Sequence, residues 1–399
     1  MMGRGRTVRK TAVEDVPALQ EKGEAVGHLM RGKALFEESR FKEALIQFKK
    51  ATEHLDGPGA DPRLMVDALV HISRTRTELG ELDKAEAEAL RAMELVRRPG
   101  MTADLKGMAN YVLALALLRR GELDRFLKTM ERAASLLETA KDWRVLGDAY
   151  RNIGNYYLLK SVYGKALAYY NKALGIFRDH GIEKSVHLTI NNLAMVKGLQ
   201  GNRDEAIKDL GLVLEWSRRV GDIRSEYVSL TNIGYFTLLA GRWGEAIGHI
   251  DAALGFRERI PIVRLFAYNM IYKSEALLGL RDIDGADAIM SKHFRSFMAT
   301  KSGDIMGQAL RVRGMVFRER GELKKSEDDF ALGEGKLKEG GHEVDRASLY
   351  IEWAKTALKM GDERKARELF GRAREIFGRL KLSVLQGELE NETRRCGLD

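Results

Sequence analysis

Three asparagines recur at a constant spacing of 40 residues and are the clearest candidates for binding chemistry: Asn152, Asn192 and Asn232. A carboxamide offers two N–H donors and a carbonyl acceptor, so it can hydrogen-bond both the N–H and the C=O of an extended peptide. Each such bond contributes a net ~0.5–1.5 kcal/mol, and three suitably placed amides could hold a backbone without requiring a particular ligand sequence. The positions that recur beside them are Arg151, Asn191 and Thr231 immediately before, and Asn155, Met195 and Tyr235 three residues after.

Patterns for catalysis or metal binding are weak. The histidines form no i, i+4 pair that could hold a metal, and "GIEKS" at 181–185 lacks the upstream glycines of a phosphate-binding loop. "DIDG" at 282–285 lacks the downstream glutamate of a calcium loop and is typical of a helix start. No serine or cysteine nucleophile motif occurs. We therefore expect no enzymatic activity, no metal and no cofactor.

The asparagines belong to an internal repeat of 40 or 41 residues. Its anchor is usually a small residue, and the anchors are Ala44, Ala85, Phe126, Ala166, Ala206, Ala246, Ala286, Ser326 and Ala366. A small residue also precedes each anchor by twelve positions, as at Gly154, and a large apolar residue often follows it by four, as at Tyr170. Two helices joined by a short turn need small residues where their axes approach and larger ones in the neighbouring gaps. The turns commonly contain glycine, at Gly80, Gly121, Gly201, Gly241, Gly321 and Gly361.

This pattern resembles the tetratricopeptide repeat, in its long-period branch. The fourth repeat carries the family's signature positions at Tyr150, Ile153, Gly154, Tyr157, Ala166, Tyr170 and Ala173. The resemblance covers residues 25–386 and implies an all-α, right-handed superhelical solenoid of about nine helix-turn-helix repeats with a C-terminal capping helix. The repeats start near residues 25, 66, 107, 147, 187, 227, 267, 307 and 347. Residues 1–24 are expected to form a basic N-terminal tail and leading helix, and residues 387–399 a C-terminal cap and tail.

The seventh repeat departs from the pattern. Lys273 stands where an apolar residue is usual, Arg281 occupies the place of the turn glycine, and His293 replaces a small residue. Two interpretations remain open: a flexible joint, or a repeat that has diverged.

In the family, the first helix of each repeat lines the concave face. The resemblance therefore assigns nine residues to a peptide-binding groove: Arg151, Asn152, Asn155, Asn191, Asn192, Met195, Thr231, Asn232 and Tyr235. The alternative is that these amides only cap or cross-link adjacent helices. A clamp for a C-terminal carboxylate, as in tetratricopeptide cochaperones, matches at Arg151, Asn155 and Asn192, but Val228 and Asn232 lack its two further basic side chains. We therefore do not expect a chaperone-tail clamp.

The flanking repeats offer different groove chemistry. Repeats one to three are mostly apolar at the concave positions, with Leu29, Met30, Val70, Tyr111, Val112, Leu115 and Leu118. Such a surface could accept an amphipathic helix, or it could be buried by self-association or by the N-terminal segment. The eighth repeat offers Gln308, Arg311, Met315 and Arg318.

Charge and composition restrict the possible partners and location. The formal net charge of +9 is a mild excess over 399 residues, and its clearest local run is the tail with Arg4, Arg6, Arg9 and Lys10. A dedicated nucleic-acid interface is therefore not expected. Cys396 is the single cysteine and cannot form an internal disulfide. The chain lacks an apolar segment of membrane-spanning length and the apolar core of a signal peptide, which favours a cytoplasmic location.

Together these features favour a noncatalytic protein–protein interaction scaffold that binds an extended peptide or protein segment in its concave groove. The alternative is a regulatory sensor, because long-period arrays resemble the effector-binding parts of bacterial transcription activators and peptide-responsive regulators. Such a module would change shape when it binds a peptide or protein and would control a separate effector, such as a transcription regulator.

Overall fold

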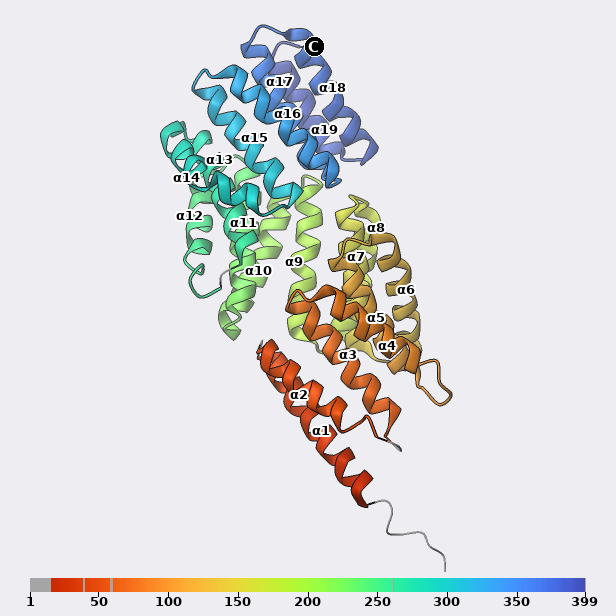
Figure 1. Ribbon diagram of the computed structural model, residues 1–399. Coiled ribbons are helices and arrows are strands. Elements are labelled where there is room, and N and C mark those ends of the chain that lie inside the picture. Colours follow the sequence, from red (N-terminus) through yellow and green to blue (C-terminus); the bar gives the residue numbers. More distant parts are fainter. Residues whose placement is uncertain (1–15, 39, 58–59, 261, 399) are drawn as a thin grey trace, which may run out of the picture. The chain divides into compact units, whose positions relative to one another are not determined.

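The computed structural model describes residues 16–38, 40–57, 60–260 and 262–398, with side chains from residue 20 onward. These residues form nineteen α-helices and no strand (Figure 1). The basic residues Arg4, Arg6, Arg9 and Lys10 lie outside the described residues. The chain divides into two compact units, one ending at Ile153 and the other beginning at Gly154.

The helices α1 to α18 follow one another as nine pairs, and α19 stands alone at the end. The helices up to the unit boundary are α1 (Val16–Glu37), α2 (Phe41–Glu53), α3 (Pro62–Glu78), α4 (Leu82–Leu95), α5 (Ala103–Arg119), α6 (Leu123–Ala140) and α7 (Trp143–Leu159), which crosses that boundary. The second unit continues with α8 (Tyr163–Asp179), α9 (Glu183–Leu199), α10 (Arg203–Val220), α11 (Ile223–Leu239), α12 (Trp243–Leu254), α13 (Val263–Gly279), α14 (Ile283–Ala299), α15 (Gly303–Glu319), α16 (Leu323–Glu339), α17 (Glu343–Lys359), α18 (Glu363–Arg379) and α19 (Ser383–Arg395).

The packing of each pair follows the repeat pattern. All nine anchor residues are fully buried, which confirms that they mark the close approach of neighbouring helices. A Cβ added to Gly154 would lie 2.5 Å from Cε1 of Tyr170, and one added to Gly32 would lie 2.5 Å from Cε1 of Phe48. The glycine before each of these anchors is therefore required because the large apolar residue after the anchor fills the space that a side chain would need.

Turns within the pairs use the left-handed backbone region. The six predicted turn glycines all have positive φ, for example 79° at Gly121 and 81° at Gly361, which suits glycine because it lacks a Cβ. Arg281 adopts the same conformation with a φ of 66°. The seventh repeat thus keeps the turn geometry even though it has lost the glycine.

The two short motifs "DIDG" and "GIEKS" lie at a helix start and in a turn. The Asp282 carboxylate accepts a hydrogen bond from the backbone N–H of Gly285 at 2.9 Å, so "DIDG" is an N-cap, as its composition predicted. Gly181 lies between α8 and α9 with a φ of 65°. "GIEKS" therefore belongs to the turn between two repeats.

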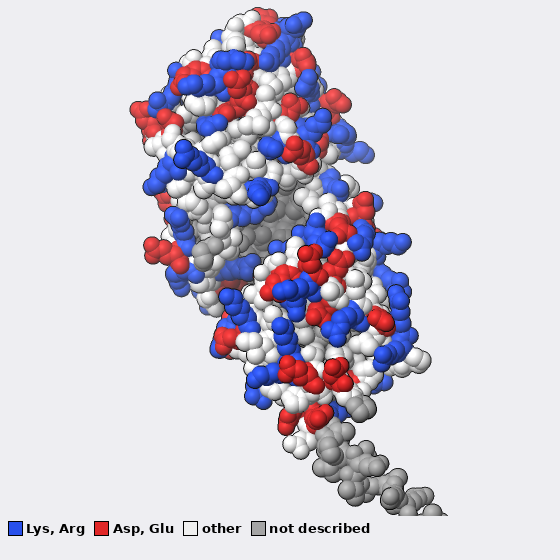
Figure 2. Space-filling model, viewed as in Figure 1, with Lys and Arg blue, Asp and Glu red and all other residues white. Residues whose placement is uncertain are grey.

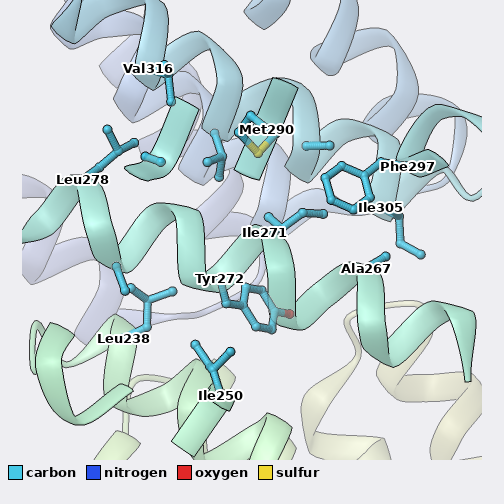
Figure 3. Packing of buried hydrophobic residues seen from close by; sticks show 14 of the residues in the cluster. Leu238, Ile250, Ala267, Ile271, Tyr272, Leu278, Met290, Phe297, Ile305 and Val316 are labelled. Carbon is cyan, nitrogen blue, oxygen red and sulfur yellow. The ribbon is translucent and has the colours of Figure 1, made fainter. Parts of the chain in front are cut away.

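One apolar cluster of the second unit extends from α11 to α15. Around α13 it contains Ile250 from α12, Met290 and Phe297 from α14 and Val316 from α15, packed about Ile271 (Figure 3). Each helix pair thus completes its core with side chains from the next pair, as expected for a repeat array. This shared core fixes the first helices of the second unit side by side, and these helices carry the candidate site.

Candidate functional site

The first helices of the pairs in the second unit surround a cavity of about 300 Å³, which we call the tyrosine cavity. It is lined by residues of α9, α11, α13, α15 and α17 together with the turn between α7 and α8. Four tyrosines define it: Tyr163, Tyr235, Tyr268 and Tyr272. Four of the predicted groove residues also line it: Met195, Thr231, Asn232 and Tyr235.

Three of the tyrosines form a stack across α11 and α13. The ring centroids of Tyr235 and Tyr272 are 4.7 Å apart, and those of Tyr268 and Tyr272 are 5.6 Å apart. Burial raises the pKa of all three hydroxyls above the ordinary value, and it raises the pKa of Tyr163 to about 12. The rings therefore stay neutral at physiological pH and offer flat faces that attract apolar groups and cations.

One wall of the cavity holds a satisfied carboxylate. Asp304 accepts hydrogen bonds from Tyr268 and Ser302 and pairs with Arg264. Arg264 also donates to the Tyr268 hydroxyl at 2.9 Å. Burial opposes ionisation of Asp304, but these hydrogen bonds and the charge of Arg264 outweigh it and hold its pKa below the ordinary value. The Asp304 carboxylate is thus ionised and already paired with Arg264.

The second carboxylate, Asp345, differs because it lacks a cationic partner among the described residues. Its Oδ1 accepts a hydrogen bond from Nε2 of Gln308 at 2.9 Å, and no ion pair within the described part of the chain reaches it. Burial, with the negative charges of Asp304 and Glu275, raises the pKa of Asp345 to about 6, although His342 and Arg311 act in the opposite direction. The cavity therefore holds an acid whose ionised form His342 and Arg311 compensate only in part, and a ligand cation would stabilise that ionised form further.

The repeated asparagines of the second unit cross-link neighbouring helices. Nδ2 of Asn192 donates to Oδ1 of Asn155 at 3.1 Å, and Nδ2 of Asn232 donates to Oδ1 of Asn191 at 3.1 Å. The Tyr170 hydroxyl also donates to Oδ1 of Asn155, at 2.8 Å. All four amides remain partly exposed, and each of these cross-links uses only one of the two N–H groups of its donor. These amides therefore do link neighbouring helices, as the alternative expected. Each donor amide still has one N–H group that could bind a ligand.

Arg151, Asn152 and Thr231 are also hydrogen-bonded within the protein. Arg151 and Asn152 belong to the first unit, where Arg151 donates to Asp148 at 2.7 Å. Asn152 donates to the Asp148 carbonyl at 2.9 Å and to the Tyr111 hydroxyl on α5 at 3.4 Å, so it also links neighbouring helices. Thr231 in the second unit is only 3% exposed; its hydroxyl donates to the Tyr227 carbonyl and accepts a hydrogen bond from Nδ2 of Asn269 on α13 at 2.8 Å. Peptide contact by these residues stays a prediction.

A second, larger cavity adjoins the tyrosine cavity, and both are lined by Leu199, Tyr235 and Val344. Its volume is about 790 Å³, and α19 forms part of its wall. The guanidinium of Arg203 makes two hydrogen bonds of 2.6 Å to the carboxylate of Glu388 on α19. The terminal helix thus reaches the start of α10 as well as capping the last repeat.

Ion pairs rather than amides line this larger cavity. Arg318 pairs with Glu352 at 2.8 Å, and Lys355 lies 2.9 Å from both Glu352 and Glu392. Burial disfavours the ionised form of Glu352, but Lys355 and Arg318 outweigh it and lower its pKa to about 2. The concave surface of this unit therefore changes from amides on α9 and α11 to tyrosines on α13 and to paired charges on α15 and α17.

Sequence reasoning missed the most distinctive part of the cavity. Tyr268, Tyr272 and Glu275 fall in the seventh repeat, where the departures from the pattern drew attention away from its concave positions. Extending the same register from the asparagines would have found Tyr272, which lies 40 residues after Asn232. Asp345 precedes its repeat and carries no repeat signal.

The apolar surface predicted for the first three repeats is not available to a ligand in the way we expected. Leu29, Val70 and Val112 are almost fully buried, because the first helices of successive pairs pack directly on one another in this unit. Met30 remains 68% exposed. The predicted docking surface is therefore wrong for those three residues, which belong to the core.

Charge, metal-ligating side chains and hydropathy bear on three other kinds of site, for nucleic acid, for a metal and for a membrane. Lys and Arg alternate with Asp and Glu over the face drawn in Figure 2, without a field of one sign. Within the described residues, no group of three metal-ligating side chains comes together. Among the same residues, none of the helices combines the length and apolarity that a membrane span requires.

Comparison with solved structures places this geometry in a known fold. The chain matches a Rap protein complexed with Competence and Sporulation Factor at 14% identity and a TM-score of 0.71, covering 90% of this chain and 99% of that one. The chain folds as a tetratricopeptide-like solenoid. It also matches the apo quorum sensor NprR from B. thuringiensis at 12% identity and a TM-score of 0.67, covering 89% and 99% of the two chains. NprR with its cognate peptide NprX matches at 12% identity and a TM-score of 0.62, covering 92% and 100%.

No family model matches the sequence, and neither does any curated protein. The likeness to Rap and NprR therefore concerns the fold, which these chains share over nearly their full lengths at low sequence identity.

Proposed function

We propose that the protein is a noncatalytic receptor for a peptide or an extended protein segment, which lies in the concave groove of the second unit. The observation that carries the proposal is the tyrosine cavity, where five first helices converge with stacked aromatic rings, a partly exposed amide and a partly compensated acid. Volumes of about 300 and 790 Å³ for the two adjoining cavities fall in the range of ligand sites. Rap, which has the same fold, is complexed with Competence and Sporulation Factor in a solved structure, and NprR is complexed with its cognate peptide NprX.

Each part of the groove has a distinct task in this proposal. Asn192 and Asn232 hydrogen-bond the ligand backbone with the capacity left by their cross-links. The tyrosine stack holds an apolar or cationic side chain. Asp345 pairs with a basic side chain or a free amino terminus, because a ligand cation would compensate its buried charge.

A defined library of synthetic heptapeptides tests this proposal. We expect the retained peptides to share a basic side chain or a free amino terminus. Asp345→Asn keeps the side-chain shape and should remove that preference, whereas Asp328→Asn, at an exposed position on α16, should leave it unchanged. Retention of no peptide would contradict the receptor function, and equal preferences in the wild type and Asp345→Asn would contradict the assigned role of Asp345.

A sensor function is the second candidate, and the reach of α19 favours it. The Arg203–Glu388 contact joins residues 185 positions apart in the chain and closes one side of the larger cavity. A ligand that displaced α19 would change the shape of the second unit, and a separate effector could read that change, in the cytoplasm where we expect the protein to act. Small-angle scattering with and without a retained peptide tests this, and identical curves would leave a passive scaffold.

A further inference from the structure

A separate pocket lies between α13 and α14, away from the residues of the groove. We call it the α13–α14 pocket. Its volume is about 350 Å³, and its lining includes Arg257, Ile262, Phe266, Ala267, His293 and Phe297. It shares no lining residue with the tyrosine cavity or with the larger cavity beside it. Ala267 and Phe297, which form its buried floor, lie at the same end of the core cluster in Figure 3.

The pocket coincides with an early end of α12. This helix has 12 residues, whereas α10 has 18 and α14 has 17. Gly255 is the C-cap of α12, and the chain then turns through residues 256–260 before α13 begins at Val263. If α12 were longer, its next helical turn would pack near the start of α13. Because α12 is short, it does not cover the apolar surface at Phe266.

His293 is the departure from the repeat pattern that borders this space. The equivalent residues Ala133, Ala173 and Ala253 are fully buried and allow close helix packing. His293 instead lies edge-on to Phe266, with ring centroids 5.4 Å apart, and is only partly buried. The divergence of the seventh repeat therefore has a local consequence, which is an open pocket with one polar ring in its wall.

The mouth of the pocket is positively charged. The guanidinium carbon of Arg257 lies 4.0 Å from the centroid of the Phe266 ring, and Arg257 forms no ion pair with any residue the structure describes. Burial lowers the pKa of His293, and the charges of Lys292 and Arg257 lower it further. An anion at the mouth would thus meet an uncompensated guanidinium held in place by an aromatic ring.

We propose that the α13–α14 pocket binds a small apolar carboxylate, with its aromatic or branched body between Phe266 and Phe297 and its carboxylate paired with Arg257. The apolar floor accounts for the body of this ligand, and the cation at the mouth accounts for its charge. The volume of about 350 Å³ suits a small molecule.

Calorimetric titration with 4-phenylbutyrate tests the proposal, with the neutral 4-phenylbutyramide as the matched probe. We expect saturable binding of the carboxylate and about tenfold weaker binding of the amide, because the charge-assisted bond to Arg257 is lost. Arg257→Gln should weaken carboxylate binding by about the same factor. Arg259→Gln is the matched control, because Arg259 lies in the same turn, is exposed and is not among the pocket residues; it should leave the affinity unchanged.

The ring resonances of the histidines locate the bound probe. We expect the carboxylate to shift those of His293 and to leave those of His249, on α12, unchanged. Absence of saturable binding, equal affinity for the acid and the amide, or equal effects of the two arginine variants would overturn the proposal. Binding lost in Arg264→Gln but kept in Arg257→Gln would place the probe in the tyrosine cavity and would overturn it as well. None of these outcomes depends on whether the groove binds a peptide.

Discussion

Replacing Asp345 by asparagine should stabilise the second unit at neutral pH and have a smaller effect in acid. Asp345 accepts a hydrogen bond from Gln308 and lacks an ion-pair partner among the described residues. Burial raises its pKa from the ordinary 3.8 to about 6. Asparagine keeps the shape and can accept the same hydrogen bond, but it removes the ionised form that burial disfavours.

The sign follows from proton linkage. Below about pH 3 the carboxyl is mostly protonated in both the folded and the unfolded chain, so Asp345 does not disfavour folding. Between about pH 4 and 6 the unfolded chain loses the proton while the folded chain keeps it, so the stability that Asp345 contributes falls as the pH rises. The shift from 3.8 to about 6 corresponds to about 3 kcal/mol at most, and the opening of the side chain to the cavity reduces this to ~1–3 kcal/mol.

Urea unfolding followed by circular dichroism at pH 7.5 and at pH 4.5 measures this difference. We expect Asp345→Asn to raise the free energy of unfolding by ~1–3 kcal/mol at pH 7.5 and by about a third of that gain at pH 4.5, where only part of the linkage acts. Asp328→Asn on α16 is the matched control and should stay within about 0.5 kcal/mol at both pH values. An equal gain at both pH values, or a loss at pH 7.5, would refute the reasoning.

Three further substitutions test the packing and the ion pairs of the second unit. Gly154→Val should lower the free energy of unfolding by ~1–3 kcal/mol through overpacking, measured by urea unfolding. Arg311→Ala should lower it by about 3–5 kcal/mol, because the bidentate pair with Glu275 is buried and Glu275 would be left uncompensated. Arg203→Glu should speed backbone hydrogen exchange in α19, and adding Glu388→Arg should restore slow exchange. The interaction free energy between the two side chains should stay below about 1 kcal/mol because the pair is partly exposed.

Matched variants separate these effects from general damage. Gly164→Ala introduces a Cβ that meets nothing within 4 Å, so it should not destabilise the chain. Arg311→Met combined with Glu275→Leu removes both charges and should cost less than Arg311→Ala alone. If Gly154→Val left stability unchanged, the close packing described for the repeats would be incorrect. Unchanged exchange in α19 after Arg203→Glu would show that Glu388 does not hold that helix.

The helix pairs could be predicted from the sequence because their packing is local. Gly154, Ala166 and Tyr170 meet across a single turn, so their spacing alone specifies the contact. The same holds for the turn glycines, and it holds for Asp282, whose side chain caps the helix that follows it. Each of these contacts involves residues fewer than about twenty positions apart.

The cavities could not be predicted in the same way, because they depend on how many repeats curve around one another. Asp345 lies outside the repeat register, and the Arg203–Glu388 contact joins residues 185 positions apart. The concave register placed Asn232 and Tyr235 at the cavity, but it also placed Val70 on an open surface where the helices in fact pack together. The repeat register identifies which residues share one face of a helix. Whether that face is exposed depends on how the neighbouring helices of the unit pack against it.

The dissociation constant of a library-selected peptide tests the central claim most directly. It should be measured for the wild type and for the double variant Asn192→Ala and Asn232→Ala, with Asn171→Ala, at an exposed position on α8, as the control. We expect the double variant to keep its helical circular dichroism and to bind about tenfold more weakly, as the loss of two net hydrogen bonds requires. An affinity equal to that of the wild type would contradict the role of the asparagines in holding a peptide.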